Sequence, residues 1–240
     1  MSQLNQLAPG MAEVLSDPRL AELKARPPGR SRAGMILQPK NPPLLGESPF
    51  LTFEEDFDEP PVTKVEWVNE PQDAGPMGRG NGFPNLKVRP RFEEARQKPA
   101  KGICDAWRYA GWMIASPRFV EILRRFDPQV VVTADIDWVF SDGQKLDGYQ
   151  FLDVTRLIHA YDYQRSAVIV EVTEERGKYV KGLSYPRALR DDVPRDIHIF
   201  REARHPQDIF FSRELAKVLA TSGLSQFKFE DPVRVGSVEF

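Results

Sequence analysis

Hydrophobic residues recur at helical spacing in two stretches of the chain. In the first, residues 116–128, four apolar residues share one helical face: Phe119, Ile122, Leu123 and Phe126. Ser116 stands where a helix N-cap is expected. The second stretch, residues 212–223, repeats this design with Ser212 in the same position. We therefore predict a helix over each stretch.

Other segments alternate apolar and polar residues or form short apolar runs between turn residues, which predicts β-strands. These segments are 33–39, 62–68, 129–140, 146–157, 167–173, 196–202, 207–211 and 225–229. The sequence SDGQK at 141–145 is typical of a turn, so we expect 129–140 and 146–157 to pair as a hairpin.

These elements predict an α+β fold, with mostly antiparallel sheets, a few helices packed on them and two strand–helix–strand modules. Fifteen of the 21 prolines lie in the first 99 residues, so this half should be poor in regular elements. We expect a flexible N-terminal arm over 1–32 and one domain over 33–240. Within that domain, 33–106 would be irregular and Pro-rich, and 107–230 would be the compact core.

Composition narrows the class of protein further. Hydrophobic residues make up 41% and charged residues 28%, as in soluble globular proteins. No apolar run approaches the roughly 20 residues of a membrane-spanning helix, and we expect no secretory signal. Cys104 is the single cysteine, which suits a reducing compartment. We therefore expect a cytoplasmic protein.

The stretch FLDVTRLIHAYDYQRS, residues 151–166, holds the three residue types of a nucleophilic triad. If it were helical from 153 to 163, His159, Asp162 and Ser166 would share one face. In such a triad the histidine lies between the serine and the acid, and the serine usually occupies a strained, glycine-flanked turn. Here the acid lies between the other two in sequence and no glycine flanks Ser166. We therefore predict that these polar residues cap a turn or face solvent.

Other candidate chemistry is equally sparse. The histidines and the cysteine do not have the spacing of a metal site: His159, His198, His205 and Cys104. The glycine-rich sequence at 75–82 matches no phosphate-binding motif, and we interpret it as a mobile loop. Asp135 and Asp137 would share one face of a strand, without a third ligand. We expect no metal and no cofactor.

Charge is distributed in blocks. Residues 47–73 contain nine acids and one lysine, whereas residues 83–108 contain seven bases and three acids. The simplest interpretation is two solvated faces of opposite charge. The basic block is short and the net charge is −2, so we expect no nucleic-acid partner.

Several segments, taken together in their order and spacing, resemble the Imm11-type (DUF1629) immunity proteins of bacterial polymorphic toxin and type VI secretion systems. The likeness extends over roughly 35–230. The matching landmarks are Trp112–Arg118, Asp127-Pro128, Tyr149–Val154, Asp162–Ser166, Ile199–Arg201, Phe211–Leu215 and Gly223-Leu224.

This resemblance implies a binding protein and not an enzyme. Such proteins are encoded beside a toxin gene and hold the cognate toxin inactive in the cytoplasm of the producing cell. The resemblance implies no catalytic residue and no cofactor. The expected partner is therefore the toxin, with neither nucleic acid nor membrane involved.

One acidic segment with interleaved aromatic residues could enter the basic cleft of a toxin that attacks nucleic acid. Our hypothesis for toxin contact is therefore this set: Phe53, Glu54, Glu55, Asp56, Phe57, Asp58 and Glu59. Two alternative functions stay open. One is a small hydrolase that uses His159 and Ser166, and the other is an adaptor in a secretion system.

Overall fold

Within the residues that it describes, the computed structural model contains four β-sheets, three α-helices and one 3-10 helix. It describes residues 8–21, 23, 35–40, 42, 47–55, 65–71, 78–83, 86–97, 103–173, 177–234 and 237–240. The α-helices are α1 (Met11–Leu15), α2 (Pro117–Phe126) and α3 (Arg213–Thr221), and the 3-10 helix is η2 (Pro18–Leu20). This arrangement confirms the predicted α+β class.

The largest sheet has five strands in the order β10 (Leu157–Ile158), β13 (Ile199–Glu202), β14 (Ile209–Ser212), β2 (Phe50–Glu55) and β15 (Phe227–Glu230). A four-stranded sheet follows the order β5 (Ala106–Tyr109), β6 (Trp112–Ala115), β9 (Gln150–Val154) and β7 (Val131–Asp135). Within these two sheets only β10 and β13 pair in parallel. The predicted pairing of 129–140 with 146–157 is confirmed by β7 and β9.

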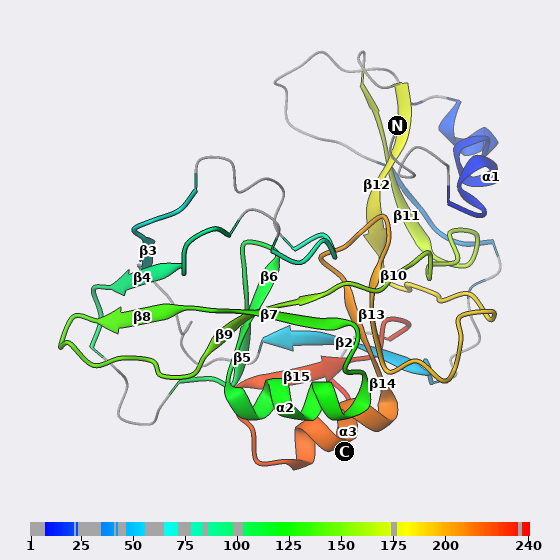
Figure 1. Ribbon diagram of the computed structural model, residues 1–240. Coiled ribbons are helices and arrows are strands. Elements are labelled where there is room, and N and C mark those ends of the chain that lie inside the picture. Colours follow the sequence, from blue (N-terminus) through cyan, green and yellow to red (C-terminus); the bar gives the residue numbers. More distant parts are fainter. Residues whose placement is uncertain are drawn as a thin grey trace.

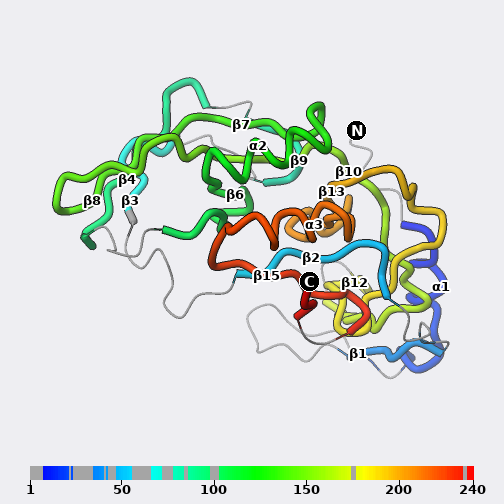
Figure 2. Tube along the Cα trace, turned by 90° about the horizontal axis from the view of Figure 1, so that it is seen from below, coloured from blue at the N-terminus to red at the C-terminus, as the bar shows by residue number. Residues whose placement is uncertain are grey.

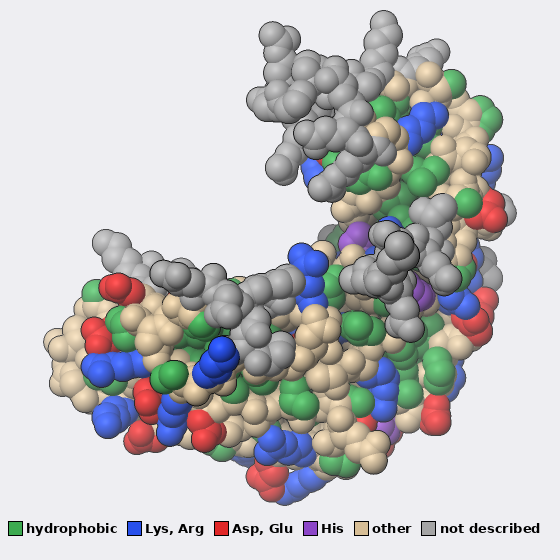
Figure 3. All heavy atoms as spheres, turned by 45° about the horizontal axis from the view of Figure 1, so that its top comes forward, with side chains coloured by type: hydrophobic (Ala, Val, Ile, Leu, Met, Phe, Trp, Pro, Cys, Tyr) green, Lys and Arg blue, Asp and Glu red, His purple; other side chains and the backbone are tan. Residues whose placement is uncertain are grey.

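Two three-stranded sheets form lobes that project from this centre (Figure 1). One contains β3 (Val65–Trp67), β4 (Arg91–Glu94) and β8 (Asp137–Phe140), and the other contains β1 (Met35–Leu37), β11 (Ala167–Thr173) and β12 (Gly177–Ser184). We call them the β3–β4–β8 lobe and the β11–β12 lobe. A broad hollow separates the two lobes on the face shown in Figure 3.

Both predicted long helices are present and cover the central sheets. Ser116 and Ser212 cap them as expected, because each side-chain oxygen accepts a backbone N–H three residues on, from Phe119 and Leu215, at 3.2 Å. Helix α3 lies between α2 and β2 (Figure 2). The buried faces of α2 and α3 join one hydrophobic core with residues of β2, β6, β9 and β14.

The N-terminal region contributes to a second core. Ala8, Met11 and Leu20 are buried there with Phe200 and Phe210 of the largest sheet. β1 pairs antiparallel with β11 and forms one edge of the three-stranded sheet of the β11–β12 lobe. The described part of the predicted arm over 1–32 therefore packs against the domain.

A third core is aromatic and joins the β3–β4–β8 lobe to the four-stranded sheet. All four tryptophans are buried in it: Trp67, Trp107, Trp112 and Trp138. The ring of Phe92 in β4 stacks on Trp138 in β8, with centroids 4.9 Å apart. Offset stacking of this kind adds to the burial of apolar area.

One expectation of local structure was wrong. The stretch 129–140 is two strands in different sheets, since the chain leaves one sheet at Ile136. Asp135 therefore bonds to Gln150, whereas Asp137 forms an ion pair with Arg89 at 3.0 Å. The helix over 153–163 that would place the three triad residue types on one face is absent, because β9 continues into β10 and then a turn.

Of the helices in the described residues, none has the length and apolar character that a membrane span requires.

Candidate functional site

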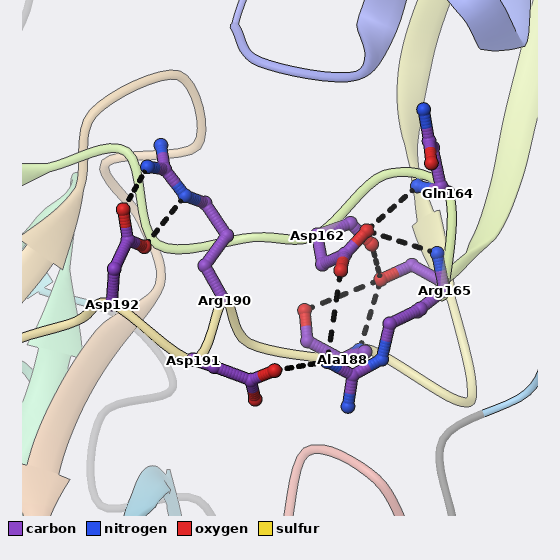
Figure 4. A network of polar contacts seen from close by, with 8 residues as sticks. Asp162, Gln164, Arg165, Ala188, Arg190, Asp191 and Asp192 are labelled. Carbon is purple, nitrogen blue, oxygen red and sulfur yellow. Dashed lines mark hydrogen bonds and ion pairs between the residues drawn. The ribbon is translucent and has the colours of Figure 1, made fainter.

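The turn after β10 contains Asp162 and Ser166, two of the three residues considered above as a triad, and Figure 4 shows Asp162 in this turn. Asp162 accepts the backbone N–H groups of Gln164 and Arg165 at 3.0 and 3.1 Å. The Ser166 hydroxyl donates to the Asp162 carbonyl at 2.6 Å and accepts the N–H of Ala188 at 2.9 Å. Both residues therefore hold the turn together, as capping residues do.

His159 does not complete a triad. Its side chain is exposed, and no described interaction joins its ring to Asp162 or Ser166. Ser166 is 1% exposed and its oxygen is occupied by backbone groups, so it is not placed to attack a substrate. The described arrangement of these three residues does not support the hydrolase hypothesis.

A second set of contacts ties this turn to the segment 188–192. Arg165 pairs with Asp191 at 3.1 Å, and Arg190 donates to Asp192 at 2.9 Å (Figure 4). Arg190 also donates to the backbone carbonyl of His159, 3.4 Å away. The end of β10 is thus braced by charged side chains of this segment.

The same turn lines a pocket of about 440 Å³ beside the N-terminal region. Asp17, Arg19 and Lys40 lie on its opposite side. The side chain of Arg19 donates two hydrogen bonds to the Asp17 carboxylate and its backbone N–H donates a third, and these bonds hold the pKa of that carboxyl well below its usual range. These charges satisfy one another, and nothing in the pocket specifies a ligand.

A fully buried ion pair lies where the two largest sheets meet. Asp153 of β9 and Arg201 of β13 are 2.7 Å apart, and both side chains are 0% exposed. Burial raises the pKa of Asp153 and lowers that of Arg201, because each charge has lost its hydration. Arg201 also donates to the backbone carbonyls of Val154 and Gly111.

This ion pair also anchors the glycine-rich segment. The N–H of Gly82 donates to Asp153 at 2.9 Å. Gly78 packs backbone to backbone on Gly111, where an added Cβ would lie 1.7 Å from the Gly111 oxygen. Gly78 has a φ of 62°, a left-handed conformation that glycine adopts without strain. Residues 78–82 are therefore held in place, in contrast to the mobile loop predicted for 75–82.

The turn between β13 and β14 has a buried carboxylate. One oxygen of Glu202 accepts the N–H groups of Arg204 and His205 at 2.6 and 2.7 Å. The other oxygen has no hydrogen-bond partner among the described residues. Burial, reinforced by the charge of Asp208, raises the pKa of Glu202 to about 7, although the two backbone donors oppose the change.

The predicted toxin-contact residues fall into three groups. Phe53 is 0% exposed and packs on Phe119 and Phe227, so this residue supports the core instead of facing a partner. Glu54 and Glu55 are partly exposed and both contact Arg108. Asp56, Phe57, Asp58 and Glu59 lie outside the described residues.

Metal and thiol chemistry gain no support from the geometry. Among the described residues, no three His, Cys, Asp or Glu side chains gather as metal ligands would. Cys104 is buried, and burial raises the pKa of its thiol, which disfavours the reactive thiolate. His198 lies 3.0 Å from the Ser212 hydroxyl and against the ring of Phe126, which is a structural environment.

Sequence reasoning did not find Asp153, Arg201 or Glu202. The sequence did contain a signal of burial, because these charged residues follow apolar residues within short strands. Asp153 lies in FLDV, and Arg201 and Glu202 lie in IFRE. A charge in such a strand is buried only with a partner. The identity of that partner, 48 residues away, depends on which strands meet.

Comparison with protein families identifies the class of the chain: it belongs to the Immunity protein family (Imm11), whose model matches residues 48–234. The match covers every described strand except β1. No curated protein matches the sequence significantly. The family membership supports an immunity role.

Proposed function

We propose that this chain binds a cognate antibacterial toxin and neutralises it in the cytoplasm of the cell that produces both. The observation that carries the proposal is the family match over residues 48–234. An immunity role calls for tight and specific association, which needs a preformed surface with a few strongly contributing residues. The toxin would be the product of the neighbouring gene.

Inhibition by binding, without catalysis, agrees best with the arrangement of His159 and Ser166. The hydroxyl of Ser166 bridges two backbone segments, and the ring of His159 is separate from it. A binding protein needs neither residue to react. Protection would then come from the toxin surface that the bound chain covers.

Co-expression with the product of the neighbouring gene tests this function. The toxin alone should stop growth, and the pair should restore it and copurify as a stable complex. In a purified assay, toxin activity should fall in proportion to added chain and reach zero at about one chain per toxin, if affinity is at the nanomolar level usual for tight complexes.

Two results would contradict the proposal. A non-toxic neighbour or the absence of a complex would remove the immunity role for this pair. Full protection at far less than one chain per toxin would indicate turnover, and would favour the hydrolase alternative.

The proposal also includes the acidic segment, Phe53 to Glu59, as a region that contacts the toxin. Glu54 lies opposite Lys228 in the pairing of β2 with β15, and it also contacts Arg108. Its charge is thus partly balanced within the chain. The contribution to toxin binding would come mainly from the acids that follow it.

Charge reversal at Asp56, Asp58 and Glu59 should weaken toxin affinity about tenfold, and the loss should shrink as salt rises because exposed charges are screened. Affinity is to be measured by calorimetry at two salt concentrations. Glu214→Lys, a charge reversal at an exposed position of α3, serves as the control. Equal affinity of the triple variant and the control would exclude the acidic segment as a contact.

A further inference from the structure

An exposed apolar residue lies at the edge of the largest sheet. Leu157 of β10 is 42% exposed, although most large apolar side chains of the described residues are buried. β10 is an edge strand, paired on one side with β13. His159, two residues further on, is exposed as well.

The glycine-rich segment lies directly against this residue. A Cβ added to Gly80 would be 2.7 Å from the Leu157 side chain, so the backbone of the segment contacts Leu157. Arg79 and Asn81, on either side of Gly80, are both exposed. Leu157 therefore lies against the backbone of a segment that carries an exposed guanidinium and an exposed amide.

These side chains stand on a rigid base. Gly78 is packed on Gly111, and Gly82 is bonded to Asp153 of the buried ion pair. Both ends of the five-residue segment are thus attached to the interior. Because little backbone freedom remains to be lost on binding, such a segment is preorganised for a partner.

The surroundings are cationic. Arg79 forms no ion pair with any residue that the structure describes. The pKa of His159 is lowered by partial desolvation of its ring and by the charges of Arg204 and Arg190 nearby. Cationic side chains therefore lie along the glycine-rich segment and the end of β10, although Arg190 among them is paired with Asp192.

The location favours a protein partner. β10 lies at the base of the β11–β12 lobe in the ribbon, and the space-filling view shows a hollow between this lobe and the β3–β4–β8 lobe (Figures 1 and 3). A partner seated there would be contacted from more than one side. A nucleic acid would need a longer basic track to gain comparable affinity.

We propose that Arg79 and Leu157 form the centre of the toxin-docking surface, and that they receive an acidic segment of the toxin with an apolar side chain that covers Leu157. This proposal rests on the proposed function and names the chemistry of the partner. Leu157 supplies apolar area, and Arg79 supplies a charge without an internal partner and a fork that matches a carboxylate.

Arg79→Glu and Leu157→Asp should each weaken binding of the purified neighbouring toxin about 30-fold, the size of a typical hot-spot effect. Arg118→Glu is the matched control, because Arg118 is an exposed arginine on α2 without a described ion pair. Circular dichroism and the urea midpoint should show that all three variants are folded. The affinity lost in Arg79→Glu should decrease at high salt.

The outcomes separate this proposal from the proposed function. If the unmodified chain fails to bind the toxin, the function itself is wrong. If the unmodified chain binds and both variants bind equally well, the toxin docks elsewhere and this inference is overturned. A short nucleic acid that binds the unmodified chain and loses affinity with Arg79→Glu would also overturn the assignment of the surface to the toxin.

Discussion

Asp153→Ala is expected to lower the free energy of unfolding by about 3–5 kcal/mol, the largest effect predicted for a single substitution in this protein. The change would leave the guanidinium of Arg201 buried without its counter-charge. It would also remove the acceptor of the Gly82 N–H. A buried charge without a partner retains its full desolvation cost.

Urea unfolding followed by tryptophan fluorescence measures this effect, since all four tryptophans are buried. The exposed pair of Arg125 and Glu121 on α2 offers the control, and Glu121→Ala should cost less than about 1 kcal/mol. Equal costs for the two alanine variants would mean that the buried pair is not an important electrostatic contact.

A double variant identifies the cause. Asp153→Leu combined with Arg201→Met removes both charges and should be more stable than Asp153→Ala alone. Some cost should remain, because the carbonyls of Val154 and Gly111 would lose their donor. If the double variant were no more stable than the single one, the loss would come from packing and not from the uncompensated charge.

Glu202→Gln should change how stability depends on pH. The pKa of Glu202 is raised from 4.5 to about 7, so between these values the native state binds more protons than the unfolded state. Stability therefore falls as pH rises from 4.5 to 7 and is then constant with respect to this group. At about 1.4 kcal/mol per pH unit, the loss is about 3 kcal/mol.

Glutamine is neutral throughout, so the variant should lack this loss. Relative to that of the unmodified chain, the free energy of unfolding of the variant should rise by about 3 kcal/mol between pH 4.5 and 8. At every pH the variant should also be less stable by a constant amount, because the amide nitrogen of the glutamine would be buried without an acceptor. The charged or titratable groups around Glu202 are unchanged in both proteins: Asp208, His205, Arg204, Tyr161 and Tyr163.

Urea titrations at several pH values provide the comparison, with Glu66→Gln on the exposed face of β3 as the control. Using the difference between two proteins removes the contribution of the histidines in the same pH range. Parallel pH profiles for the unmodified chain and Glu202→Gln would show that Glu202 has no unusual ionisation in the folded chain.

Elements whose signal is local were predictable from the sequence. Helix α2 has its apolar face and its cap within twelve residues, and β11 is apolar except for Glu171 and Thr173. Strand β2 was missed because Glu54 and Glu55 made it resemble an acidic loop. Its strand character comes from pairing with β14 and β15, more than 150 residues away.

The candidate site depended even more on long-range pairing. The roles of Asp162 and Ser166 as turn residues were predictable, because their bonds are made within a few residues. The exposure of Leu157 and its contact with Gly80 follow from where β10 lies at a sheet edge. Composition marked residues 75–82 as a loop, but it could not show what holds the segment in place.

Strand β1 has a consequence for where the folded unit begins. The family match starts at residue 48, yet β1 pairs with β11 from residues 35–37, and Met11 and Leu20 fill the core beneath. A protein cut at the family boundary would have an open strand edge and uncovered aromatic rings, the features that favour aggregation. The shortest useful recombinant version of this chain therefore retains the segment ahead of the family match.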